Sequence, residues 1–263
     1  MVFLLYYISE MFYILNYYRK SDNKMEDKIL KFVEMVEESN NIVFFGGAGV
    51  STESGIPDFR SEDGLYNQHY KYPPEQILSH TFFMKHTKEF YEFYRDKMNS
   101  LKYEPNVTHI KLAELEKKGK LKAVVTQNID GLHQKAGSKK VYELHGSVLR
   151  NYCMSCNQFY SADYVFRGID VPKCECGGII KPDVVLYQEG LDNKVIEGAV
   201  RAINEADMLI VAGTSLTVQP ASGLINYYRA NKLVLINKTA TFYDHRADLV
   251  INDSLGKVFS NLR

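Results

Sequence analysis

Four cysteines form the clearest metal-binding pattern in the chain. They occur as two close pairs, Cys153 and Cys156 with two residues between them, and Cys174 and Cys176 with one. Two close pairs of thiolates suit the tetrahedral coordination of zinc, and a site closed by four sulfurs leaves no position for water or substrate. We therefore predict a structural zinc site on these residues. Paired disulfides and reactive thiols remain alternative interpretations of the same pattern.

A glycine-rich segment offers a second kind of chemistry, the binding of phosphate groups. Residues 46–52 read GGAGVST, follow a short apolar run and open a predicted helix. Glycines let a backbone approach a pyrophosphate, and the N–H groups at the start of a helix favour negative charge. Thr52 stands where the dehydrogenase fingerprint needs a small residue, which argues against hydride transfer. Dinucleotide binding and a connection that binds nothing both remain open.

Side chains of the types used in catalysis follow in three more segments. Residues 54–61 read SGIPDFRS and place a carboxylate, an aromatic ring and a guanidinium side by side. Residues 126–133 read TQNIDGLH and begin at the last residue of a predicted strand, where a ligand is expected. The alternative is that the Asn and Asp only cap a turn. Residues 143–147 read ELHGS and contain His145, and histidine is suited to proton transfer near neutral pH. His133 is a competing candidate for that role.

The elements that must position these residues follow from the hydrophobic pattern. Short apolar runs predict buried strands, and apolar residues at helical spacing predict amphipathic helices between them. The predicted strands are 42–45, 123–126, 208–212, 233–237 and 249–251. This alternation indicates an α/β fold with a mainly parallel sheet covered on both faces, which binds ligands at the carboxyl ends of its strands.

Two stretches interrupt the alternation and predict a second, smaller lobe. One carries an aromatic helical region, at about residues 56–103, and the other carries all four cysteines, at about residues 151–180. The large lobe is then expected to comprise about residues 25–55, 104–150 and 181–263.

The composition excludes several classes of protein. The 263 residues are 45% apolar and 24% charged, as in a globular protein, which excludes disorder and a disulfide scaffold. With 32 basic and 32 acidic side chains, the chain shows no electrostatic footprint for direct binding of nucleic acid. Clustered thiols favour a reducing compartment, and we expect a cytoplasmic protein.

The first 24 residues differ from the remainder and match neither a spanning helix nor a signal peptide. They could form a membrane-surface helix, form an extra packed helix, or be translated from sequence upstream of a true start at Met25. We favour the third interpretation, because the excess of lysine over arginine suggests an AT-rich gene whose flank would translate into such residues. A membrane partner is expected only if residues 1–24 belong to the native protein.

The motifs resemble those of the sirtuins, the NAD-dependent protein deacylases. Residues 47–61, GAGVSTESGIPDFRS, are similar to the first signature of that family, and residues 126–133 are similar to the second. The motifs keep the family's order over about residues 26–257. The resemblance implies a Rossmann-like parallel-sheet domain with a smaller lobe made of a zinc ribbon and helices. It also implies NAD, structural Zn²⁺ and acetylated protein lysines as ligands and substrates.

The resemblance also assigns roles to individual residues. His145 falls where the family keeps its general base, whereas His133 belongs to a strand-to-helix connection. The implied contacts with NAD are Gly47, Ala48, Gly49, Ser51, Thr52, Asp58, Phe59, Arg60, Gln127, Asn128, Ile129, Asp130, Gly213, Thr214, Ser215, Asn237 and Asp253. Val184, Val185 and Tyr187 are implied to pair with an extended substrate peptide by strand addition.

Three details depart from the family pattern. The Cys174 and Cys176 pair has one intervening residue where relatives have two, so weaker zinc binding is expected. Relatives commonly have Phe-Gly where this chain has Tyr187 and Gln188. Sirtuins that remove acidic acyl groups have a Tyr-x-x-Arg pair, but here Tyr94 takes the arginine position and Arg95 follows it. One residue turns a helix by about 100°, so we expect Arg95 to miss the acyl pocket and acetyl groups to be preferred.

The reaction implied by the resemblance is NAD-dependent deacetylation of protein lysines. Its products are deacetylated lysine, nicotinamide and O-acetyl-ADP-ribose. One alternative is transfer of ADP-ribose to a protein or to water, as in a mono-ADP-ribosyltransferase or NAD glycohydrolase. Another is a non-enzymatic NAD-sensing module with a zinc ribbon. The presence of His145 favours deacetylation.

Overall fold

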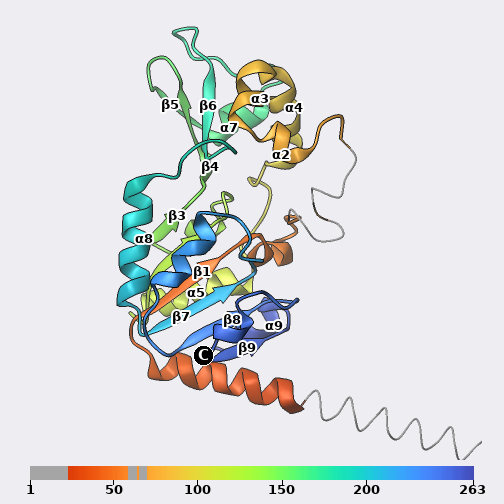
Figure 1. The fold of residues 1–263 in the computed structure, drawn as a ribbon. Coiled ribbons are helices and arrows are strands. Elements are labelled where there is room, and N and C mark those ends of the chain that lie inside the picture. The colour runs from red at the N-terminus through yellow and green to blue at the C-terminus, as the bar shows by residue number, and fades with distance from the viewer. Residues whose placement is uncertain (1–22, 59–63, 65–69) are drawn as a thin grey trace, which may run out of the picture.

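The larger lobe is built on a six-stranded parallel sheet (Figure 1). The computed structural model describes residues 23–58, 64 and 70–263. The strand order of this sheet is β3-β2-β1-β7-β8-β9. The strands are β1 Ile42–Gly46, β2 Leu121–Thr126, β3 Val141–Glu143, β7 Met208–Ala212, β8 Leu233–Ile236 and β9 Leu249–Ile251. The chain runs outward from β1 in one direction and from β7 in the other. The boundary between β1 and β7 is therefore the switch point, where such sheets bind ligands.

Both faces of this sheet are covered, which explains the continuous apolar runs of its central strands. Ile42 and Phe44 of β1 pack into one core with the helix at residues 23–38, and Val43 and Phe45 pack into the core on the opposite face. The first core also holds α5 (Val107–Lys117) and α9 (Leu255–Phe259), and the second holds α8 (Asn193–Glu205) and η4 (Ala221–Tyr227). The predicted α/β class and the five predicted strands are confirmed.

The smaller lobe combines short helices with an antiparallel sheet of order β5-β4-β6. Its elements are α2 (Pro74–Ile77), α3 (His80–Lys85), α4 (Thr87–Lys97), α7 (Ala162–Arg167), β4 (Gly146–Cys153), β5 (Phe159–Ser161) and β6 (Ile180–Val184). Aromatic residues of α3 and α4, such as Phe83 and Tyr94, build its separate core. Figure 1 shows β4 rising from the end of β3 into this lobe.

Local capping contacts fix the ends of several helices. The Asn106 side chain accepts from Thr108 N–H at the start of α5, and Asp192 accepts from two N–H groups at the start of α8. The helix at residues 23–38 includes Met25, which packs against the large core. Residues 1–22 lie outside the described part, and the interpretations of that segment stay predictions. Within the described residues, no helix has both the length and the apolar character needed to span a membrane.

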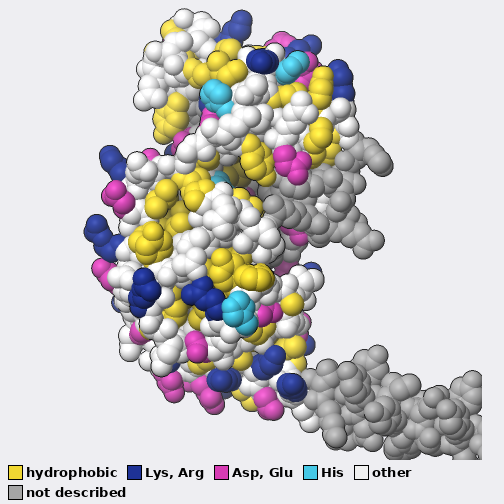
Figure 2. Space-filling model, viewed as in Figure 1, with side chains coloured by type: hydrophobic (Ala, Val, Ile, Leu, Met, Phe, Trp, Pro, Cys, Tyr) yellow, Lys and Arg dark blue, Asp and Glu magenta, His cyan; other side chains and the backbone are white. Residues whose placement is uncertain are grey.

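Charged side chains of both signs are interspersed on the face shown in Figure 2. This distribution agrees with the equal numbers of basic and acidic residues in the chain. Among the described residues drawn on that face, the Lys and Arg side chains are scattered among acidic and uncharged ones.

Candidate active site and metal centre

The loop after β1 packs directly on the loop after β7. The Gly47 N–H donates to the carbonyl of Ala212 at 3.2 Å, and the Gly49 N–H donates to the carbonyl of Gly213 at 2.8 Å. A β-carbon on Gly49 would lie 2.8 Å from Cα of Gly213, and one on Gly47 would lie 2.7 Å from Cβ of Thr214. These glycines therefore let two backbones meet at the switch point, where a dinucleotide would lie.

The chain does not form the helix that the sequence predicts after this turn. Instead it makes two short 3₁₀ turns, η1 (Ala48–Val50) and η2 (Thr52–Ser54). Gly55 ends the second turn with a left-handed φ of 89°, and Pro57 disfavours helical backbone at the residue before it. The expectation of a full helix dipole at this position was wrong, because the chain makes only these two short turns here.

Polar side chains link the ends of three strands of the large sheet. Gln127, after β2, donates from Nε2 to Thr214 Oγ1 at 3.0 Å. The Thr214 N–H, after β7, donates to Oδ1 of Asn237, which follows β8, at 2.9 Å. Asn237 is buried, and within the described residues its Nδ2 has no hydrogen-bond partner. An unpartnered donor at the carboxyl end of β8 fits the predicted contact of Asn237 with NAD.

A second polar group joins the turn after β1 to the loop after β2. Ser51 Oγ donates to Asp130 Oδ2 at 2.6 Å, and Asn128 Nδ2 donates to Ser51 Oγ at 3.1 Å. The Leu132 N–H donates to Asp130 Oδ1 at 2.9 Å. Burial raises the pKa of Asp130, and the hydrogen bonds from Ser51 and Leu132 oppose that rise. The structure thus brings together three residues that the sequence placed in two separate motifs.

His145 lies between β3 and β4, with its imidazole held in one orientation. Its Nδ1 is 2.9 Å from the carbonyl oxygen of Gln127. A carbonyl only accepts hydrogen bonds, so Nδ1 carries the proton and Nε2 keeps its lone pair. Burial lowers the pKa of His145, although the bond to Gln127 opposes this shift. The ring is therefore neutral at pH 7 and able to accept a proton at Nε2.

His133, the competing candidate, is buried on α6 (Leu132–Ala136). Its ring contacts Phe44 and lies 4.7 Å, centroid to centroid, from the ring of His109 on α5. Burial lowers the pKa of His133 well below its ordinary value and that of His109 to about 4. His133 is 1% exposed, a position that favours His145 as the base.

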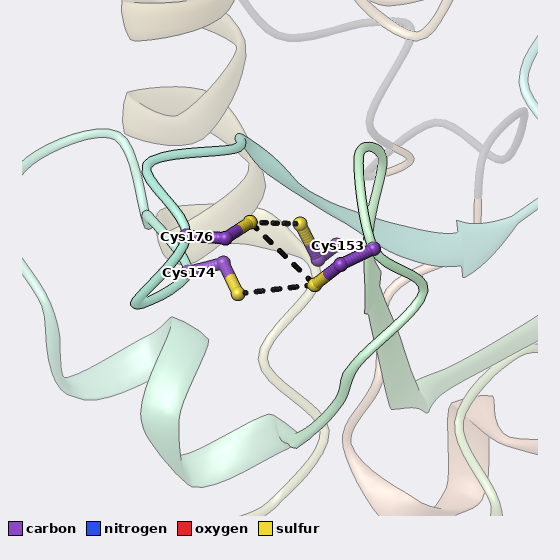
Figure 3. Close-up of side chains that lie close together, drawn as sticks. Cys153, Cys174 and Cys176 are labelled. Atoms are coloured by element: carbon purple, nitrogen blue, oxygen red, sulfur yellow. Dashed lines mark hydrogen bonds between the residues drawn. The ribbon is translucent and has the colours of Figure 1, made fainter.

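The four cysteines converge on one point of the small lobe (Figure 3). Their Sγ atoms all lie within 4.8 Å of one another, and the shortest separations are 3.5 Å. A tetrahedral site with Zn–S bonds of about 2.3 Å places sulfurs about 3.8 Å apart, so the cluster fits zinc. All four cysteines are free thiols, which excludes the disulfide interpretation in this structure.

The short spacing of the second cysteine pair is accommodated by a tight turn. The Cys174 N–H donates to Gly178 O and the Gly177 N–H donates to Cys174 O, each at 2.8 Å, and Gly177 has a left-handed φ of 84°. A β-carbon on Gly178 would lie 2.7 Å from Cys153 Sγ. Glycine at these two positions lets both sulfurs of the pair reach the cluster.

The predicted peptide-binding segment continues from β6. Val184 pairs with Gly146, and the Val185 N–H donates to the carbonyl of His145 at 3.0 Å. The N–H of Tyr187 bonds to Leu78 O, and its carbonyl accepts from His80 N–H, both at 2.9 Å. The Tyr187 backbone is therefore used inside the lobe, and 41% of the residue is exposed.

The departure from glycine at position 188 has a local explanation. Gln188 adopts a left-handed φ of 77°, which glycine normally occupies. Its Oε1 accepts from the N–H of Thr81 at 3.0 Å and from Thr81 Oγ1 at 2.7 Å, near the start of α3. Two hydrogen bonds offset the strain of the backbone.

Arg95 uses its donors inside the small lobe. Its Nε donates to Val165 O at 2.8 Å, and a second nitrogen donates to the carbonyl of Asp170. Tyr94, at the arginine position of the family's acidic-acyl pair, is buried and stacks on Phe166 with ring centroids 5.4 Å apart. This geometry supports the expectation that Arg95 does not serve a substrate carboxylate.

The remaining predicted contacts divide into three groups. Phe59 and Arg60 lie outside the described residues. Asp253 pairs with Lys257 at 2.7 Å and accepts from Ser254 N–H, so its carboxylate is engaged at the start of α9. The others, Ala48, Thr52, Asp58, Ile129 and Ser215, lie in the loops after β1, β2 and β7.

The contact between Ser100 and Asp130 was not predicted by any sequence motif. The Ser100 hydroxyl, just after α4, donates to the carbonyl of Asp130 at 2.9 Å. It links the small lobe to the polar loop after β2. A single serine after a helix carries no local signal for such a contact.

Comparison with known proteins decides the family. The model of the Sir2 family matches residues 47–220. The chain belongs to the Sir2 family. An NAD-dependent protein deacetylase of Clostridium acetobutylicum is 62% identical over 240 residues, covering 90% of this chain and 98% of the relative. Another from Fusobacterium nucleatum is 47% identical over 243 residues, covering 92% and 93%.

Solved structures of Sir2 proteins share the fold. A Sir2 bound to an acetylated peptide has a TM-score of 0.79 at 38% identity, covering 88% of this chain and 95% of that one. A Sir2 complex with a p53 peptide and NAD⁺ has a TM-score of 0.78 at 39% identity, with the same coverage. The predicted family and the Rossmann-like architecture are confirmed.

Proposed function

We propose that this protein is an NAD-dependent deacetylase of protein lysines. The observation that carries the proposal is the orientation of His145. Its Nδ1 proton is directed to Gln127 O, its Nε2 is left as an acceptor, and its own carbonyl binds Val185 of the peptide segment. A neutral base beside a peptide-binding strand suits acyl transfer, and the related NAD-dependent protein deacetylases agree with it.

Residues at the switch point would hold the dinucleotide. Backbone groups of Gly47 and Gly49 line the crossing of two loops, and the buried Nδ2 of Asn237 has no hydrogen-bond partner among the described residues. When bound, NAD supplies an electrophilic ribose carbon as its bond to nicotinamide breaks. Asn128 and Asp130 would hold the nicotinamide carboxamide, because Ser51 fixes both side chains beside the turn after β1.

His145 would then accept a proton at Nε2 from a hydroxyl of the reacting ribose. Its lowered pKa keeps the ring unprotonated at neutral pH, and the bond to Gln127 fixes the tautomer. Val184, Val185 and Tyr187 would position the acetyl-lysine peptide by main-chain pairing and side-chain contact. The expected products are deacetylated lysine, nicotinamide and O-acetyl-ADP-ribose.

The four cysteines would hold zinc away from this chemistry. The metal would order the turns between β4 and β6, and with four sulfur ligands it has no open position for substrate. A cluster of free thiols also favours a reducing compartment, so we place the enzyme in the cytoplasm.

Incubation with an acetyl-lysine peptide, with and without NAD, tests the proposal. A deacetylated peptide should form only when NAD is present, and O-acetyl-ADP-ribose should appear with it. A peptide that gains ADP-ribose, or free ADP-ribose with the acetyl group retained, would instead establish the transferase or glycohydrolase alternative. Unchanged peptide and unchanged NAD would support the non-enzymatic alternative.

A further inference from the structure

Arg150 connects the two lobes close to His145. Its Nη1 donates to Glu143 Oε2 at 2.6 Å, and its Nε donates to Asp183 Oδ2 at 2.7 Å. Glu143 ends β3 in the large-lobe sheet, whereas Asp183 lies in β6 of the small-lobe sheet. One guanidinium therefore joins β3 of the large-lobe sheet to β6 of the small-lobe sheet. His145 lies in the short segment that leads from β3 into the small lobe.

An irregularity in β4 places Arg150 between these strands. Ser147 pairs with Asp183, and Asn151 pairs with the adjacent Pro182, so residues 148–150 are extra residues in the ladder. A bulge of this kind changes the direction of the side chains it contains. Beside it, a β-carbon on Gly146 would lie 2.0 Å from the carbonyl oxygen of Asp183, so β4 and β6 are in close contact here.

The Glu143 carboxylate depends on Arg150. The Glu143 side chain is only 8% exposed, against 39% for Arg150 and 43% for Asp183. A buried carboxylate that loses its partner is left uncompensated, which is strongly unfavourable. The planar guanidinium presents several donors in a fixed geometry and can bind two carboxylates at once. Arg150 is therefore suited to hold Glu143 and Asp183 at a fixed separation.

We propose that Arg150 is a positioning residue that sets the peptide-binding segment against His145. Asp183 directly precedes Val184 and Val185, and Val185 donates to the carbonyl of His145 at 3.0 Å. The proposal rests on the deacetylase function given above. Small displacements of reacting groups lower rates strongly, so loss of Arg150 impairs use of the peptide. The nucleotide site at the loops after β1 and β7 is left intact.

Steady-state kinetics of Arg150 variants tests this role. We expect Arg150→Met to lower kcat/KM for an acetyl-lysine peptide about tenfold, and Arg150→Lys, which keeps one charge, to recover part of the loss. The dissociation constant of NAD should stay within about twofold of the wild-type value. The control is Arg167→Met, which removes an exposed pair with Asp163 in α7 and should leave all constants unchanged.

Two results would overturn the proposal. One is an Arg150→Met enzyme with wild-type kcat/KM, and the other is an equal loss of NAD affinity, which would indicate general disruption. If Arg150→Met does not fold, Arg150→Lys is measured in its place, with a smaller loss of kcat/KM expected and no loss contradicting the role.

Amide hydrogen exchange of Val185 provides a readout without turnover. The Val185 amide should exchange faster in Arg150→Met than in wild type, and at the wild-type rate in Arg167→Met, because its bond to His145 O depends on the alignment of β4 and β6. An unchanged rate in Arg150→Met contradicts the positioning role. A wild-type protein that does not deacetylate peptides would refute the proposed function alone, since the exchange comparison remains valid.

Discussion

Nδ1 of His145 lies 2.9 Å from the carbonyl oxygen of Gln127, so a residue of the loop after β2 sets the tautomer of the histidine after β3. Gln127 also donates to Thr214, and Thr214 donates to Asn237. The histidine and three residues predicted to contact NAD therefore belong to one hydrogen-bonded series across the carboxyl ends of β2, β7 and β8.

Replacing His145 by Ala should abolish most turnover. General-base catalysis contributes about a hundredfold or more, so kcat for deacetylation should fall at least that far. Circular dichroism, zinc content and NAD binding should match those of the wild type, because the ring makes one hydrogen bond to the protein backbone. His245→Ala, at an exposed position, is the matched control. Wild-type kcat in His145→Ala would refute the assignment.

Stability should fall as the pH drops below about 6.5, the ordinary histidine pKa. His109 and His133 are buried and neutral, and their folded-state pKa values are lowered, to about 4 for His109. The unfolded state therefore takes up protons first as the pH falls. Below about pH 6.5, each of these two histidines lowers the free energy of unfolding by about 1.4 kcal/mol per pH unit.

Urea denaturation between pH 7.5 and 4.5 measures this dependence. The His133→Leu variant should show a slope smaller by about one proton, that is about 1.4 kcal/mol per pH unit. An identical slope in wild type and His133→Leu would contradict the assignment of the effect to this buried ring.

The zinc prediction concerns metal content and the stability of the small lobe. Purified protein should contain about one zinc ion per chain, and Cys176→Ser should lose most of it, because one of four ligands is removed. Elemental analysis and thermal unfolding should show less zinc and a lower Tm. Ser155→Ala is the control beside the cluster and should keep its zinc. Zinc-free wild-type protein from zinc-replete cells would exclude the site.

The crossing of the two glycine loops predicts that Gly49→Ala is damaging. Its β-carbon would lie 2.8 Å from Cα of Gly213, a backbone atom that cannot turn away. Overpacking of this kind lowers the free energy of unfolding by about 1–3 kcal/mol and should weaken NAD binding. At Gly190 a β-carbon meets nothing within 4 Å, so Gly190→Ala is the control. Equal stability and NAD affinity in both variants would contradict this explanation.

The strands and the cysteine cluster could be predicted, because they depend on residues that are close together in the sequence or on a periodic pattern. Ile42 to Phe45 form a continuous apolar run because alternate residues face two cores, and the cysteine pairs lie close together in the chain. β3 was not predicted, since its three residues are only half-buried and contain no apolar run. The helix expected after Gly49 was wrong, because Gly55 and Pro57 stop it.

Contacts between distant residues could not be read from the sequence. Ser51 and Asp130 are 79 positions apart, and Gln127 and Thr214 are 87 apart. Their side chains meet because parallel strands bring their carboxyl ends to one edge of the sheet, and the pairing depends on strand order. The position of Arg150 depends on an irregular strand register, which has no sequence signature.

The most direct test of the deacetylase function is the stoichiometry of its products. Wild-type enzyme, NAD and an acetyl-lysine peptide should yield nicotinamide, deacetylated peptide and O-acetyl-ADP-ribose in equal amounts throughout a time course followed by mass spectrometry. Nicotinamide released without an equal amount of deacetylated peptide, or deacetylated peptide accompanied by free acetate and intact NAD, would contradict it.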